Sequence, residues 1–87
     1  MKRIEWKKKA LRQLRKVKDH QTQQNIKAAV GTLRNFPNCS NIKKLKTRDE
    51  YRLRVDNWRV FFTEQLTIIR IEEVKKRDER TYKRTNH

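Results

Sequence analysis

The sequence lacks the features of a small secreted or membrane-bound protein. Its 87 residues include one cysteine, one glycine and one proline, and no apolar run reaches the length of about 18 residues that a membrane-spanning helix needs. The single cysteine, Cys39, excludes an internal disulfide, and nothing after Met1 resembles the apolar run of a signal peptide. We therefore expect a cytoplasmic protein with no membrane association.

Residues that bind metals are scarce as well. His20, Cys39 and His87 lie far apart in the sequence, without the spacing of metal ligands. We expect no metal site and no cofactor. No repeat, linker or low-complexity segment marks a boundary, so residues 1–87 are predicted to form a single domain.

Acidic residues are also few. Twenty-five lysines and arginines face ten acidic residues, which leaves a net charge of +15. This exceeds what solubility requires and creates a strong positive field around the chain. Nucleic acid is the leading candidate partner, because lysine and arginine neutralise phosphates and release their counterions. An acidic protein is the second candidate.

The spacing of apolar residues predicts three N-terminal elements. Ile4 and Trp6 alternate with charged residues, which is typical of a short strand over residues 2–6. In residues 7–18 apolar side chains recur every three or four positions among basic ones, which predicts an amphipathic, basic helix. Residues 19–35 begin with polar capping candidates and continue as a second apolar stripe. The two helices are predicted to form a hairpin.

The few conformationally special residues fall between or within these elements. Gly31 lies inside the second helix, where glycine is unfavourable, so we expect a close helix contact there. Pro37 ends that helix. A short strand is predicted within residues 42–45, and residues 75–87 form either a short helix or a frayed end.

Residues 51–63 alternate between apolar and basic side chains on both sides of Asp56-Asn57, which predicts a hairpin with a two-residue loop. The predicted cross-strand pairs are Val55 with Trp58, Arg54 with Arg59, Leu53 with Val60, and Arg52 with Phe61. The predicted buried face comprises Tyr51, Leu53, Val55, Trp58, Val60 and Phe62. The opposite face carries Arg52, Arg54 and Arg59.

Like charges across a strand pair destabilise a sheet unless an anion lies between them. One arginine is most simply a solvated cover for the sheet, but three clustered arginines favour a functional role. Residues 66–74 predict a further strand that places Ile69 and Ile71 in the core. A tight turn at Glu64-Gln65 would put Arg70 opposite Arg59 as a fourth guanidinium on this face.

These elements predict an α+β protein: an N-terminal strand, a helical hairpin, then a three- to four-stranded antiparallel sheet with a short C-terminal helix or tail. This order resembles the RelE/ParE superfamily of toxins from bacterial type II toxin-antitoxin modules. The motifs that resemble it are the strand over 51–55, the Trp58-Arg59-Val60 segment, and the closing stretch from Val74 to Tyr82. The resemblance covers nearly the whole chain.

The resemblance implies a toxin that inhibits translation as a ribosome-dependent mRNA endonuclease of the RelE type. In that reaction the 2′-OH attacks its own 3′ phosphate in the ribosomal A site, without a metal. A cognate antitoxin protein and the ribosome with its mRNA are the implied partners. The alternatives are a ParE-like inhibitor of DNA gyrase and a non-catalytic nucleic-acid-binding module.

The resemblance also implies a catalytic set. Its members are Arg52, Arg54, Arg59, Arg77 and Tyr82. Arginine suits phosphate binding and stabilisation of negative charge, because it stays protonated. RelE carries lysines at the positions of Arg52 and Arg54, so a lysine acid or base cannot be transferred to them. Proton transfer stays open between Tyr82, Lys76 and His87, and Lys76 is interchangeable with Arg77 for the phosphate role.

Further residues are candidates for nucleic-acid binding. They are Phe61 and Arg70 on the arginine face, and Lys7, Lys8, Arg12 and Arg15 on the basic helix. Phe61 lies where a base can stack, and the helix residues can contact ribosomal RNA. The simpler interpretations are a solvated helix face, a Tyr82 that packs a terminal helix, and a His87 that is only a solvated end.

Overall fold

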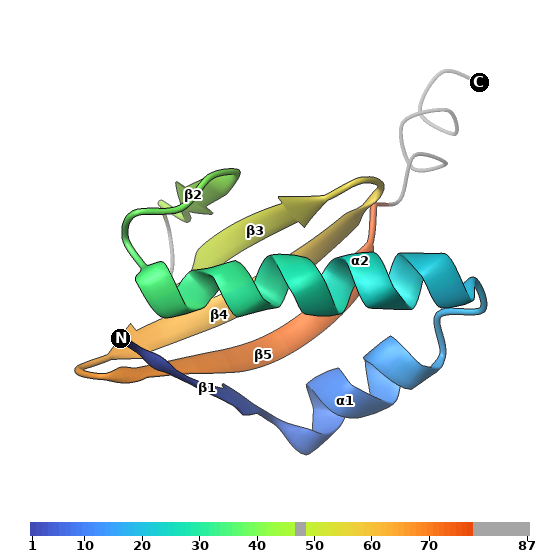
Figure 1. Cartoon of the computed structure of the whole chain (residues 1–87), viewed down its shortest axis with the longest axis horizontal. Coiled ribbons are helices and arrows are strands. Elements are labelled where there is room, and N and C mark those ends of the chain that lie inside the picture. Colours follow the sequence, from blue (N-terminus) through green and yellow to red (C-terminus); the bar gives the residue numbers. More distant parts are fainter. Residues whose placement is uncertain (47–48, 78–87) are drawn as a thin grey trace.

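A five-stranded sheet forms one layer of the protein and two helices form the other (Figure 1). The computed structural model describes residues 1–46 and 49–77. The elements are β1 (Arg3–Trp6), α1 (Lys8–Arg15), α2 (His20–Gly31), the 3₁₀ turn η1 (Thr32–Asn35), β2 (Ile42–Lys44), β3 (Tyr51–Val55), β4 (Trp58–Gln65) and β5 (Ile68–Lys76). Their order in the sheet is β1-β5-β4-β3-β2.

The predicted α+β class, the N-terminal strand and the helical hairpin are confirmed. Strands β2 to β5 form the antiparallel part of the sheet, whereas β1 pairs in parallel with β5 at one edge. Both helices cover the same face, α1 against β5 and α2 against β3. Among the described residues, no helix is long and apolar enough to cross a membrane.

The basic first helix is shorter than residues 7–18, and three of the four apolar residues of its predicted stripe pack in the core, while Leu11 is half-buried. Ala10, Leu14 and Val17 are all buried in the core. The second helix begins where the polar break predicts it, because the Asp19 carboxylate accepts hydrogen bonds from the backbone N–H and the hydroxyl of Thr22. These two bonds hold the pKa of Asp19 below its ordinary value.

Helix α1 also protects the edge of the sheet. β1 accompanies β5 only as far as Ile71, and beyond that point the Gln13 side chain accepts a hydrogen bond of 2.7 Å from the backbone N–H of Val74. We expect Gln13→Ala to lower the free energy of unfolding by about 1–3 kcal/mol, because it leaves this partly buried N–H without its acceptor. Urea unfolding measures the loss, and Gln13→Glu, which keeps an oxygen acceptor, should retain most of the stability.

The predicted turn at Glu64-Gln65 is wrong. Both residues continue β4, and the chain reverses at Leu66, which has a left-handed backbone (φ 56°) and an 85% exposed side chain. A β-bulge between Phe61 and Phe62 shifts the register once more. An exposed leucine in a tight turn opposes the usual rule that turns are polar or glycine-rich, which is why the pattern misplaced the turn.

The expected close contact at Gly31 is also wrong. A Cβ atom added at this last residue of α2 would meet no atom within 4 Å. The space beside Gly31 is therefore open, and the glycine is not explained by helix packing.

Candidate functional site

The β3–β4 hairpin forms as the sequence predicts. Val55 pairs with Trp58 and Arg54 with Arg59 around the Asp56-Asn57 loop. Asp56 adopts the left-handed conformation (φ 52°) that such a loop needs and that aspartate tolerates well. The register places the apolar side chains toward the helices and the arginines on the opposite face of the sheet.

Four arginines surround a single hollow at the loop end of this hairpin. It encloses about 200 Å³ and is lined by Arg52, Arg54, Asp56, Asn57, Trp58, Arg59 and Arg77. Arg77 follows β5, and its backbone N–H donates a 2.7 Å hydrogen bond to the carbonyl of Asn57. The end of β5 is thereby fixed to the hairpin loop, which holds Arg77 beside the other three arginines.

These four guanidinium groups have no acidic partner in the part of the chain that the structure describes, where none makes an ion pair or a side-chain hydrogen bond. Several other cations are neutralised: Lys2 lies 2.6 Å from Glu64, for example. Arg77 Nε is shielded from solvent and has no hydrogen-bond acceptor among residues 1–46 and 49–77. The hollow therefore concentrates positive charge that a bound phosphate would satisfy.

The arginine face continues onto β5 through residues that the sequence analysis did not select. Lys75 pairs with Arg59, and Glu73 pairs with Phe61. The Lys75 ammonium lies 5.9 Å from the centre of the Phe61 ring, and 3.1 Å from Oε1 of Glu73. This alignment depends on the bulge between Phe61 and Phe62, which no sequence signal revealed.

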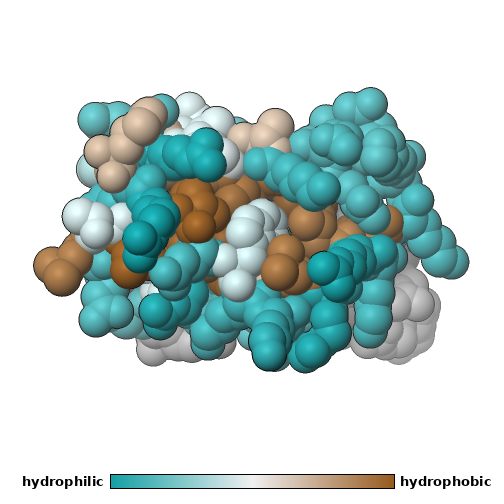
Figure 2. Space-filling view, turned by 60° about the horizontal axis from the view of Figure 1, so that its bottom comes forward, coloured by the Kyte–Doolittle hydropathy of each residue, from teal (hydrophilic) through white to brown (hydrophobic). Residues whose placement is uncertain are grey.

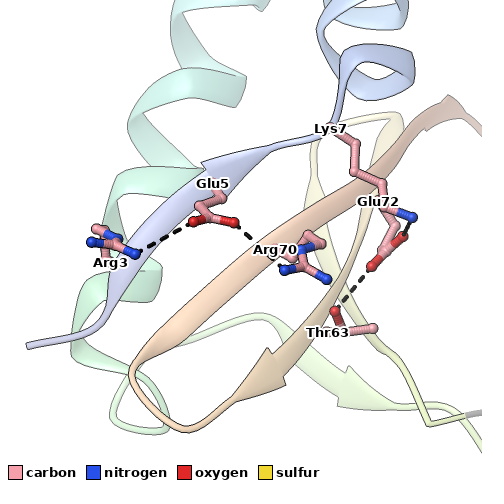
Figure 3. Close-up of polar contacts among 6 residues, drawn as sticks. All are labelled: Arg3, Glu5, Lys7, Thr63, Arg70 and Glu72. Atoms are coloured by element: carbon pink, nitrogen blue, oxygen red, sulfur yellow. Dashed lines mark hydrogen bonds and ion pairs between the residues drawn. The ribbon is translucent and has the colours of Figure 1, made fainter.

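Arg70 is not part of the cluster. It pairs with Thr63, four residues along β4 from Arg59, which is about 13 Å along the strand. Its guanidinium lies 3.6 Å from Glu5, which also contacts Arg3 (Figure 3). The prediction that Arg70 is the fourth guanidinium of the cluster is therefore wrong. Arg77 is the fourth arginine beside Arg52, Arg54 and Arg59.

Of the three candidates for proton transfer, the structure describes Lys76 alone. Lys76 pairs with Trp58, so it projects from the face of the sheet opposite to Arg59 and does not line the hollow. Of Lys76 and Arg77, which the sequence left interchangeable, Arg77 lines the hollow. Tyr82 and His87 lie outside the described residues.

The basic helix α1 carries a second group of exposed basic side chains. Lys8, Arg12 and Arg15 are exposed, and no ion pair involves them within residues 1–46 and 49–77. Lys7 differs, because its ammonium lies 2.7 Å from Glu72, which also accepts a hydrogen bond from the Thr63 hydroxyl (Figure 3).

An apolar groove lies between β1, α1 and α2. It encloses about 410 Å³, and its lining residues are Ile4, Trp6, Leu11, Leu14, Lys27, Val30, Gly31 and Arg34. Figure 2 views the side of the molecule that carries β1 and α1, where brown apolar surface lies between hydrophilic side chains. The open space beside Gly31 belongs to this groove.

The comparisons with known proteins agree on one superfamily. Residues 4–81 match the family described as "ParE toxin of type II toxin-antitoxin system, parDE". A comparison with curated proteins finds no match.

Solved structures share the fold. A chain of the RelB-RelE antitoxin-toxin complex from Methanococcus jannaschii is 24% identical, with a TM-score of 0.72 over 92% of this chain and 96% of that one. The isolated E. coli RelE toxin is 15% identical, with a TM-score of 0.74 over 99% and 97%. A chain of the RelE-RelB complex from Pyrococcus horikoshii OT3 is 20% identical, with a TM-score of 0.74 over 90% and 97%.

Proposed function

The chain belongs to the ParE toxin family of type II toxin-antitoxin systems, and we propose that it acts in the cytoplasm as a ribosome-dependent endoribonuclease. It cleaves mRNA in the ribosomal A site and so inhibits translation. The observation that carries this proposal is the hollow lined by Arg52, Arg54, Arg59 and Arg77, whose charges have no acidic partner among the described residues. The likeness to RelE structures supports the fold on which such a site is built.

The proposed reaction is attack of a ribose 2′-OH on the adjacent phosphate, with release of the 5′ oxygen. Negative charge grows on the phosphate oxygens in the transition state, and fixed cations lower the barrier because they need no rearrangement at that moment. Arginine forks match pairs of phosphate oxygens. Arg59 lies opposite Arg54 on paired strands, so the sheet keeps the two arginines next to each other, which supports a shared role at one phosphate.

Inhibition of DNA gyrase is the second candidate function, and the family match itself favours it, because that family is described as ParE toxins. A gyrase inhibitor has no need of a phosphate held for chemistry. Under that candidate the arginines would serve only to bind an acidic or nucleic-acid surface, and the same holds for a non-catalytic nucleic-acid-binding module.

Induction of the chain in bacteria separates these functions. An endoribonuclease should stop protein synthesis within minutes and leave mRNA cut at positions within codons, which mapping of RNA ends detects. The same cuts should appear with purified ribosomes and mRNA, and not with mRNA alone. Intact transcripts together with accumulated gyrase-cleaved DNA would instead establish the gyrase function.

We also propose that a cognate antitoxin occupies the groove between β1, α1 and α2. RelE relatives in the solved structures are in complex with RelB antitoxins. The groove floor is apolar, and Lys27 and Arg34 on its lining are exposed cations. An amphipathic helix with an apolar stripe and acidic flanks complements this lining.

Gly31 provides a test of this docking site. We expect Gly31→Leu to weaken antitoxin binding at least tenfold, because the new side chain enters the groove instead of the core. Toxicity without antitoxin should not change. Gly31→Ala is the control: its helical backbone (φ −58°) accepts alanine, so binding should persist. Equal affinity of the two variants, measured by calorimetry, would place the antitoxin elsewhere.

A further inference from the structure

The four arginines can hold and stabilise a phosphate, but arginine is a poor acid and a poor base, so a cleavage site needs other groups to move protons. We infer that Glu73 is the general base and Lys75 the general acid of the site. This inference rests on the proposed endoribonuclease function. Both residues lie on β5, and neither was selected from the sequence.

The register of the sheet places the pair beside the arginines. Arg54, Arg59 and Lys75 form one row across β3, β4 and β5, and Arg52, Phe61 and Glu73 form the next. Lys75 is thus the direct neighbour of Arg59. Glu73 is its diagonal neighbour, and such positions are about 7–8 Å apart, within reach of long side chains. Neither residue lines the hollow itself. Both lie on the β5 side of Arg59, next to a phosphodiester that Arg59 would hold.

Glu73 is ionised, and one of its carboxylate oxygens is available to accept a proton. Partial burial raises the pKa of its carboxyl, but the ammonium groups of Lys75 and Lys9 outweigh the burial and hold the pKa below its ordinary value. Oε1 is shielded from solvent and lies 3.1 Å from Lys75 Nζ. The other oxygen, Oε2, lies 3.6 Å from Lys9 Nζ, beyond ordinary hydrogen-bond length, and is the oxygen placed to accept a proton.

The preceding glutamate differs in this respect. One oxygen of Glu72 lies 2.7 Å from the Lys7 ammonium, and the other accepts the Thr63 hydroxyl at 3.0 Å (Figure 3). Both glutamates therefore hold a lysine of the N-terminal segment, since Glu73 lies 3.6 Å from Lys9. Because both oxygens of Glu72 have closer contacts than Oε2 of Glu73, Glu72 is the matched control.

Lys75 is oriented by two contacts. Its ammonium lies over the Phe61 ring at 5.9 Å and beside Glu73 at 3.1 Å, on a side chain that is otherwise exposed. Ring and carboxylate both attract a cation, so they hold the ammonium on the arginine face despite the nearby guanidinium charges. The proton donor is therefore held in place before substrate arrives.

The proposed step balances without a further reactant. A carboxylate oxygen of Glu73 takes the proton of the 2′-OH as the 2′ oxygen bonds to phosphorus. The bond from phosphorus to the 5′ oxygen breaks as Lys75 protonates that oxygen. The products are a 2′,3′-cyclic phosphate and a 5′-OH. Return of the proton from Glu73 to Lys75, across the 3.1 Å between them, restores the site.

Single-turnover cleavage of a synthetic mRNA on purified ribosomes tests the base. We expect Glu73→Gln to slow cleavage about 10²–10⁴-fold, the usual contribution of a general base, while its affinity for the programmed ribosome stays unchanged. Glu72→Gln also removes the charge that holds a lysine, and its rate should stay within about threefold of wild type. Equal rates for the two variants would overturn the inference.

A second substrate tests the acid. When sulfur replaces the bridging 5′ oxygen at the cleaved linkage, the leaving thiolate needs no proton, since thiols are far more acidic than alcohols. Lys75→Ala should cut the natural mRNA at least 10²-fold more slowly and recover near wild-type rate on the sulfur-containing mRNA. Glu73→Gln should stay slow on both. No recovery of Lys75→Ala would overturn its role as acid.

The same assay separates this inference from the function on which it rests. If wild-type protein cuts both mRNAs and the Glu73 and Lys75 variants cut them as fast as wild type does, only the proton-transfer assignment is wrong. If wild-type protein cuts neither mRNA on ribosomes, the endoribonuclease function is wrong, and the assignment falls with it.

Discussion

Arg59→Ala is expected to lower the rate of mRNA cleavage on ribosomes by about 10²–10³-fold, the loss that follows removal of one preorganised donor to a developing oxyanion. Arg59 is central in the row Arg54, Arg59 and Lys75, and it lines the hollow with Arg77. No ion pair in the described part of the chain depends on it, so its removal leaves no acidic residue unpartnered. The free energy of unfolding should therefore stay equal or rise slightly, as like-charge repulsion is relieved.

Two further variants make this prediction specific. Arg70→Ala removes the same charge from the same face about 13 Å along the strand, and it should cut mRNA almost normally. Arg59→Lys keeps the charge without the fork, so we expect an intermediate rate. If Arg59→Ala and Arg70→Ala lower the cleavage rate to the same extent, the whole face binds RNA by net charge, as a non-catalytic module does.

The hairpin could be predicted from the sequence because its signals are local. Alternation of apolar and basic residues fixes which side chains face the core, and a two-residue loop then fixes every pair from Tyr51 to Phe62. The arginine face and its repulsion follow directly. The proximity of Arg77 was given by the family resemblance, and its hydrogen bond to Asn57 gives the physical reason.

The rest of the site depends on non-local features. A single extra residue at the bulge beside Phe61, together with a turn at the exposed Leu66, decides that Lys75 and not Arg70 faces Arg59. Neither feature has a strong sequence signal, because bulges occur in many residue contexts and an apolar turn residue opposes the usual pattern. The proton-transfer half of the site lies on the strand that these two features position, which is why sequence reasoning left it open.

The prediction at Gly31 failed for a different reason. The cost of glycine within a helix was attributed to a close contact, yet the space beside it is open. A glycine in a helix is consistent with a close contact inside the fold or with a contact to a partner, and the sequence does not distinguish the two. The groove on which Gly31 opens favours the second explanation, which the Gly31→Leu variant tests.

The largest effect on stability is expected from Phe62→Ala, which should lower the free energy of unfolding by about 3–5 kcal/mol. Phe62 is fully buried in β4, and its ring packs against Tyr51 at 5.4 Å and against Phe36 at 5.7 Å. Phe36 follows η1, so this contact joins the helical layer to the sheet. Small domains have a total stability of about 5–15 kcal/mol, so the variant should be close to unfolded at growth temperature. Thermal and urea unfolding followed by circular dichroism measure the loss.

Phe61→Ala is the matched control, because the two phenylalanines are consecutive and project from opposite faces of the sheet. Phe61 is only half-buried, and its ring contacts the Lys75 ammonium instead of the core. Its loss should cost less than about 1 kcal/mol of stability, as for surface substitutions in general, yet it should slow mRNA cleavage, because Lys75 loses one of its two orienting contacts. Phe62→Ala should slow cleavage only in proportion to the unfolded fraction and recover at low temperature. If Phe61→Ala were the less stable of the two, the division of β4 into a core face and a reactive face would be wrong, and with it the register that places Glu73 and Lys75 beside the arginines.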